Sequence, residues 1–115
     1  MMTPPDIVAR ALTGKRFPLE DEKRCQSTIE EALSIFADMR REVSCTGGVI
    51  DFVVGRTGVE VKLKGAKEAI RRQIRRYAKD DQLDAIILLT AKPVGMESEI
   101  DDKPIVEIRM GMSWL

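Results

Sequence analysis

The segment from Ile50 to Leu63 constrains the fold more than any other part of the chain. It reads Ile-Asp-Phe-Val-Val-Gly-Arg-Thr-Gly-Val-Glu-Val-Lys-Leu, so two runs rich in β-branched residues flank the turn-forming stretch from Gly55 to Gly58. This pattern is typical of a β-hairpin. A loop of two or of four residues within that stretch predicts a register in which Asp51 faces Lys62 and Val53 faces Glu60.

This register sorts the side chains of the hairpin by face. The apolar face carries Ile50, Phe52, Val54, Val59, Val61 and Leu63, and the other carries Asp51, Glu60 and Lys62 around Val53. Asp51 and Glu60 would be diagonal neighbours about 7 Å apart, where they repel each other unless a cation compensates. Oxygen ligands favour Mg²⁺ or Mn²⁺. The alternative is an ordinary surface salt bridge.

The rest of the chain predicts helices and strands on both sides of the hairpin. A helix start at Thr3, Pro4, Pro5 and Asp6 leads into Ile7–Leu12. Further helices are expected at Glu22–Met39 and Ala66–Lys79, and strands at Arg41–Cys45, Ala85–Leu89 and Ile105–Met110, with Ala85–Leu89 central and Ile105–Met110 at an edge. We expect one α/β domain, with residues 1–18 as an N-terminal helix and linker and 19–115 as the core.

The composition excludes two common kinds of functional site. The 115 residues include no histidine, and the two cysteines lack metal-ligand spacing, which excludes a structural zinc site and His-based catalysis. No apolar run approaches membrane-spanning length, so we expect no membrane partner and a cytoplasmic location. The 19 basic and 19 acidic residues balance overall, but from Lys62 to Lys79 eight Lys or Arg accompany one acid, Glu68.

Two helices carry candidate functional residues. On a helical wheel, Glu22 falls within the apolar stripe formed by Cys25, Ile29, Ala32, Leu33 and Phe36, and is therefore expected to point inward. On the later helix, Ile70, Gln73, Ile74 and Tyr77 share a face, and the arginines lie mostly off it: Arg71, Arg72, Arg75 and Arg76.

Ile50-Asp51, followed by Val59-Glu60-Val61-Lys62, resembles the D…ExK signature of the PD-(D/E)XK nuclease superfamily, with Ile50 in place of the usual proline. Gln73 and Tyr77 resemble the QxxxY motif of its RecB-type branch. The resemblance spans about Glu22 to Thr90. It implies a restriction-endonuclease-like core, with a mixed sheet of about five strands flanked by helices in the order αβββαβ.

The resemblance also implies roles for individual residues. Asp51, Glu60 and the Val61 carbonyl would hold Mg²⁺ or Mn²⁺, and Lys62 would orient the attacking water. Glu22 would support the metal through water, with Glu42 as its rival, and Gln73 with Tyr77 would hold a phosphate or a base. The four arginines would contact DNA phosphates without reading sequence.

The expected function is therefore a metal-dependent DNA nuclease acting in replication, recombination or repair. One alternative is a Holliday-junction resolvase, whose symmetric substrate would require a homodimer. Another is a non-catalytic DNA-binding subunit that works with a replication or recombination partner protein. The Glu60–Gly65 run and the end of the chain, from Lys103, are similar to short phage-borne members of the superfamily.

Overall fold

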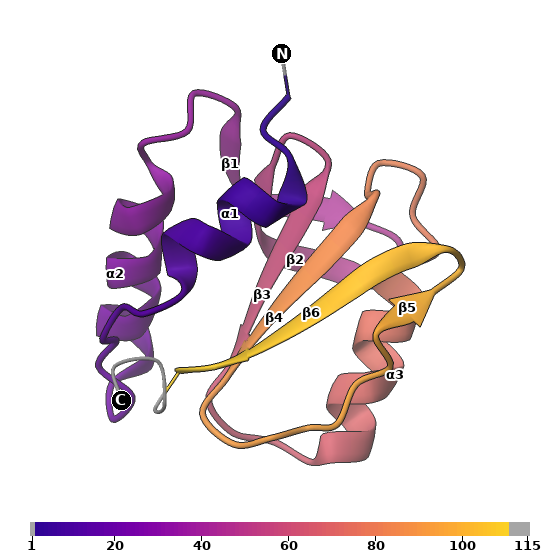
Figure 1. Ribbon diagram of the computed structural model, residues 1–115. Helices are drawn as coiled ribbons and strands as arrows, with labels where there is room; N and C mark the ends of the chain where they lie inside the picture. The colour runs from indigo at the N-terminus through magenta and orange to yellow at the C-terminus, as the bar shows by residue number, and fades with distance from the viewer. Residues whose placement is uncertain (1, 111–115) are drawn as a thin grey trace.

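The computed structural model describes residues 2–110 and shows an α/β protein with a mixed six-stranded sheet and three helices (Figure 1). In chain order the described elements are α1 (Pro5–Leu12), α2 (Glu22–Leu33), β1 (Met39–Cys45), β2 (Gly48–Val54), β3 (Thr57–Lys62), α3 (Lys67–Tyr77), β4 (Ala85–Thr90), β5 (Glu99–Ile100) and β6 (Lys103–Arg109).

The strands lie in the order β1-β2-β3-β4-β6-β5. The first three form an antiparallel meander, β4 is parallel to both β3 and β6, and β5 is antiparallel to β6. All six residues of β4 are buried, which confirms the prediction of a central strand. The two-residue strand β5 was not predicted, because it lies in the polar stretch from Lys92 to Pro104 and has no hydrophobic pattern.

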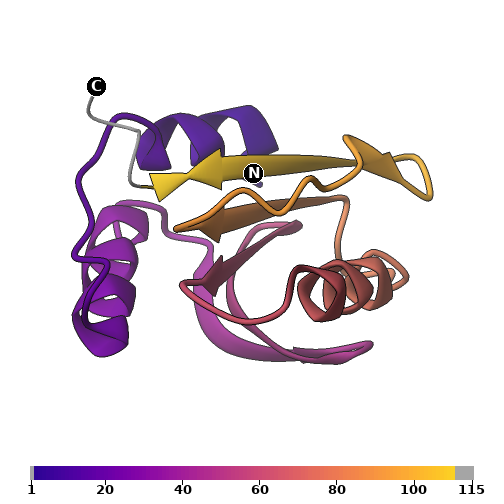
Figure 2. The ribbon, with the colours of Figure 1, turned by 90° about the horizontal axis from the view of Figure 1, so that it is seen from below.

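The helices cover both faces of the sheet, as Figure 2 shows, with α1 and α3 on opposite sides. One apolar cluster joins α1 and α2 to the sheet through Leu12, Ile29 and Phe52 among others. The second joins α3 to the other face, with Ile74, Tyr77 and Leu88. The sheet therefore separates two cores, and β2 and β4 contribute residues to both of them.

The predicted register of the β2–β3 hairpin is wrong by two residues. Val54 pairs with Thr57, Val53 with Gly58 and Phe52 with Val59, so only Gly55 and Arg56 form the turn. Gly55 adopts φ +63°, which suits a tight turn. Gly58 is a strand residue rather than a turn residue, because it pairs with Val53. A Cβ at this position would lie only 2.5 Å from Ile50 Cδ1, which explains the glycine.

Ile50 also departs from the predicted face. It is buried with α3, whereas Phe52, two residues away, packs with α1 and α2. The change coincides with Glu42 on β1, where a backbone φ of +53° interrupts the pairing with β2 between Arg41 and Val43. A strict alternation of faces along β2 could not anticipate this break.

The second helix ends at Leu33 rather than Met39. Ser34 closes α2, and turns at Phe36 and Met39, whose N–H groups donate to the carbonyls of Leu33 and Phe36, lead directly into β1. No Gly or Pro marks this end in the sequence. Phe36 nevertheless packs against the predicted core.

Within residues 2–110, none of the helices is long and apolar enough to cross a membrane.

Candidate active site

The carboxylates of Asp51 on β2 and Glu60 on β3 each accept a hydrogen bond from a backbone N–H of the opposite strand. The Asp51 N–H donates to Glu60 Oε1 at 3.0 Å, and the Val61 N–H donates to Asp51 Oδ2 at 2.8 Å. The two strands are thus joined here by side chains, just beyond the Phe52–Val59 pair. In the observed register the two acids lie closer together than on the predicted diagonal.

Lys62 Nζ lies 3.2 Å from Glu60 Oε2 and forms an ion pair with it. Glu60 is only 3% exposed, and Asp51 is partly buried. Burial, followed by the charge of Asp51, raises the pKa of Glu60 to about 7. Burial also raises the pKa of Asp51. Ionising both of these neighbouring carboxyls is therefore unfavourable, and the charge of Lys62 offsets only part of their repulsion and burial.

The donor set of this site fits a hard divalent cation. Asp51 and Glu60 supply carboxylate oxygens alone, the ligand type that Mg²⁺ and Mn²⁺ prefer. A cation between them would relieve the repulsion that raises the pKa of Glu60. In the described part of the chain, however, no group of three His, Cys, Asp or Glu residues could hold a metal ion. Any further ligand would have to be a backbone carbonyl, such as that of Val61, water or substrate.

The expectation that Glu22 points inward is wrong. Glu22 is exposed, because it is the first residue of α2, with Asp21 as its N-cap, and a wheel argument does not hold at a helix terminus. Its charge nevertheless contributes to raising the pKa of Asp51. The rival Glu42 is also exposed and lies 3.8 Å from Arg41 Nε. Neither acid is buried at the site.

Gln73 and Tyr77 lie beside the start of β2. Gln73 Nε2 donates to the Tyr77 hydroxyl at 2.9 Å, and that hydroxyl donates to the Val49 carbonyl at 3.1 Å. Tyr77 is fully buried, and after burial itself the charge of Glu60 helps to raise its pKa. The tyrosine thus has a satisfied hydroxyl within the core, close to the acid pair, while Gln73 remains half-buried.

The four arginines of α3 fall into two pairs. Arg75 binds Glu97 through Nε and Nη2 at 3.1 and 3.2 Å, and both Arg71 and Arg75 lie 3.6 Å from Glu68. Arg72 and Arg76 are exposed and form no ion pair with any residue between 2 and 110. Of the predicted DNA-contacting residues, these two are free to meet a phosphate.

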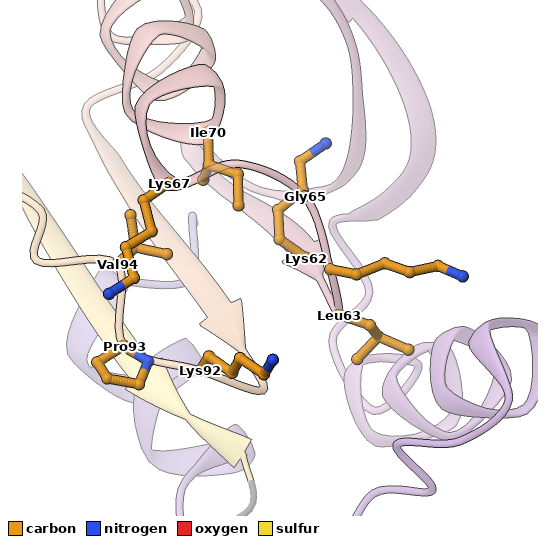
Figure 3. A pocket seen from close by; sticks show the side chains of 9 residues that line it. Lys62, Leu63, Gly65, Lys67, Ile70, Lys92, Pro93 and Val94 are labelled. Carbon is orange, nitrogen blue, oxygen red and sulfur yellow. The ribbon is translucent and has the colours of Figure 1, made fainter.

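Sequence reasoning missed Thr90 and a pocket next to Lys62. Thr90 pairs with Lys62 across β3 and β4, and its hydroxyl is buried with no hydrogen-bond partner among the described residues. The only sequence signal was a polar residue at the end of the apolar run Ala85–Leu89. The pocket, called the lysine pocket below, is lined by Lys62, Lys64, Lys67 and Lys92 together with apolar residues such as Ile70 and Val94 (Figure 3).

Comparison of the chain with protein-family models, with curated proteins and with solved structures gives no match. A function for this chain therefore has to be inferred from the chemistry of its own residues.

Proposed function

We propose that this chain is a Mg²⁺-dependent DNA nuclease with a restriction-endonuclease-like core of the PD-(D/E)XK type. The observation that carries the proposal is the interlocked pair of Asp51 and Glu60 beside Lys62. Two apolar side chains in these positions would join the sheet without electrostatic cost. Retaining two repelling carboxylates in a largely buried place instead favours a functional site.

The arrangement supplies the groups that phosphodiester hydrolysis needs. Asp51 and Glu60 would hold the cation, which on binding lowers the pKa of water and polarises the phosphate. The Lys62 ammonium can orient the attacking water and offset charge that develops on the phosphate oxygens. Water oxygen then bonds to phosphorus as the bond to the leaving sugar oxygen breaks, and the released alcohol takes up a proton.

The surroundings of the acid pair also support the proposal. The exposed side chains of Arg72 and Arg76 lie on α3, the helix that also carries Gln73 and Tyr77 beside the site. Their positive charges can contact successive backbone phosphates. The order helix, meander, helix, strand from α2 to β4 is the order that the proposed superfamily implies.

Cleavage of single-stranded, duplex, flapped and four-way DNA with Mg²⁺ and with a chelator tests the proposal. The wild type should cut at least one of these only with Mg²⁺. Asp51→Asn should abolish cleavage and keep DNA binding, because the carboxylate serves the cation and the arginines serve the backbone. Asp84→Asn is the matched control, since Asp84 is an exposed acid paired with Arg56 at 2.9 Å. Unchanged turnover in Asp51→Asn would remove the acid pair from the reaction.

A non-catalytic DNA-binding subunit is a second candidate, and one observation favours it. No third acid completes a ligand group beside Asp51 and Glu60 within residues 2–110, and Lys62 is already the partner of Glu60. This candidate predicts DNA binding without cleavage of any of the four substrates, and no response of the protein to Mg²⁺.

A further inference from the structure

The hydroxyl of Thr90, the last residue of β4, is buried without a hydrogen-bond partner among the described residues. Within residues 2–110 it is the one buried side-chain oxygen or nitrogen in this condition. Burying a hydroxyl without a partner is unfavourable, and native proteins seldom do so. A partner that reaches the hydroxyl in another state of the protein would account for it.

Thr90 lies on the face of the sheet that carries the acid pair. Along β4, Leu89 packs with α1 and α2 and Leu88 packs with α3, so Thr90 is on the side that α3 covers. Thr90 pairs with Lys62 of the parallel strand β3, just as Leu88 pairs with Glu60. Neighbouring strands lie about 4.8 Å apart, and paired residues project to the same face. Thr90 and Lys62 are therefore neighbours across the two strands.

The Lys62 side chain is not enclosed and has room to change its position. Its Nζ lies 3.2 Å from Glu60 Oε2, and the side chain is 26% exposed. In Figure 3 it extends away from Lys67. Lys62 lines both the lysine pocket and a neighbouring hollow that follows α3 as far as Gln73. The ion pair with Glu60 can therefore break without any rearrangement of the buried core.

The two oxygens of Glu60 are held differently. Oε1 accepts the backbone N–H of Asp51 at 3.0 Å, in a contact that joins β2 to β3, whereas Oε2 contacts only the mobile ammonium of Lys62. Oε2 is therefore the oxygen that Glu60 can offer to a cation shared with Asp51. A divalent ion at Oε2 would attract the carboxylate more strongly than the ammonium does and would repel that ammonium. Occupation of the cation site thus favours release of Lys62.

We propose that Thr90 is a positioning residue for Lys62: its hydroxyl accepts a hydrogen bond from the Lys62 ammonium once a divalent cation has replaced that ammonium at Glu60. An ammonium has three donors and no acceptor, so it needs such a partner. The side-chain carbonyl of Gln73 is a rival acceptor, but Gln73 is half-buried and can bond to water, whereas Thr90 gains a bond that it otherwise lacks.

This inference rests on the proposed function, because it requires the cation site. It adds a role that the acid pair does not supply. With its ammonium bonded to Thr90, Lys62 stays beside the carboxylates in a fixed position, from which it can orient the attacking water. Without that acceptor the released side chain would move freely in the two hollows that it lines.

The test measures Mg²⁺ binding without DNA, by thermal melts across a Mg²⁺ titration and in a chelator. Thr90→Val removes the hydroxyl and keeps the shape of the side chain, and Thr90→Ser keeps the hydroxyl. In the chelator Thr90→Val should melt no lower than the wild type, because it loses no hydrogen bond. It should bind Mg²⁺ about tenfold more weakly, and Thr90→Ser should bind it as the wild type does.

A double-mutant cycle identifies the donor. In a Lys62→Met background, Thr90→Val should no longer change the Kd for Mg²⁺, because the ammonium that the hydroxyl accepts from is gone. Gln73→Leu should change the Kd less than Thr90→Val does. In DNA cleavage at saturating Mg²⁺, Thr90→Val should lower kcat and leave KM for DNA unchanged, because Thr90 is enclosed and acts through Lys62.

Equal destabilisation of Thr90→Val in chelator and in Mg²⁺ would overturn the inference, because it is the result of a purely structural role. A larger effect of Gln73→Leu than of Thr90→Val would assign the acceptor to Gln73 and overturn it as well. If Mg²⁺ affinity is the same in Thr90→Val while the wild type cuts DNA only with Mg²⁺, the inference fails and the proposed function stands. If the affinity falls, Thr90→Ser restores it and no DNA is cut, the proposed function fails and the contact between Lys62 and Thr90 stands.

Discussion

Replacing Glu60 with glutamine should make the stability of the protein less sensitive to pH. Burial and the charge of Asp51 raise the pKa of Glu60 from 4.5 to about 7 in the folded protein. The folded state therefore holds this proton more tightly than the unfolded state does. Stability from the protonated form is fully present below about pH 4.5 and is lost as the pH rises through about 7.

The size of the loss follows from the difference in pKa. Each pKa unit corresponds to about 1.4 kcal/mol, so ionisation of Glu60 should lower the free energy of unfolding by about 3 kcal/mol, most of it between about pH 5 and 8. Asp51, whose pKa is also raised, adds a loss of the same sign. For a chain of this size, 3 kcal/mol corresponds to roughly 10 °C in Tm.

Few other groups should add to the pH dependence of stability between about pH 5 and 8. The chain has no histidine. Asp38, Asp80 and Glu97 have lowered pKa values, so their contributions to stability are lost only below the ordinary carboxyl range. Glu97→Gln is therefore a matched control, because it removes an exposed carboxylate paired with Arg75 and should keep the wild-type slope between about pH 5 and 8.

Urea unfolding at about pH 5 and 8 in a chelator measures these free energies. The wild type should lose most of the 3 kcal/mol, and Glu60→Gln should lose much less and be the more stable protein at pH 8. Added Mg²⁺ should then stabilise the wild type, by about 3 kcal/mol at a hundredfold excess over Kd, and leave the variant unchanged. A wild type equally stable at both pH values would refute the buried charge repulsion, and one indifferent to Mg²⁺ would refute the cation site.

Two further substitutions test the surroundings of the site. Arg72→Ala with Arg76→Ala should weaken binding to all DNA sequences alike and lower the slope of log K against log salt by about 0.9 for each lost duplex phosphate contact, whereas Arg75→Ala, which breaks the pair with Glu97, should change it less. Equal slopes would place the DNA surface elsewhere. Tyr77→Phe should lower the unfolding free energy by about 1 kcal/mol, because the Val49 carbonyl loses its donor, and reduce cleavage less than tenfold. A loss as large as that of Asp51→Asn would place the hydroxyl in the reaction.

The sequence was sufficient for elements whose pattern is local. Alternation along β2 and β3 placed Asp51, Glu60 and Lys62 together, and the apolar run of β4 identified the central strand. Features that depend on tertiary contacts were not accessible. Gly58 resembles a turn residue in the sequence, but it lies in β3, where Ile50 and Leu83 are its close neighbours. Counting it as part of the turn made the predicted hairpin register wrong by two residues.

At the candidate site, too, the features that depend on tertiary contacts were not predicted. The start of α2 at Glu22 was predicted correctly, but a helical wheel does not show whether the first turn is covered by the rest of the protein, and Glu22 is exposed there. The ion pair of Arg75 with Glu97, and the hollow that both Lys67 and Lys92 line, bring together segments separated by many residues. Neither leaves a trace in a single sequence.

The left-handed backbone at Glu42 has a consequence for how copies of this protein can assemble. β1 is an edge of the sheet, and an unbroken edge strand is a template for pairing with another chain. The break at Glu42 and the exposed charges of Arg40, Arg41 and Glu42 make β1 a poor template. A homodimer such as a resolvase needs would therefore have to form through helices or loops, or at the opposite margin of the sheet, rather than by extending the sheet across β1.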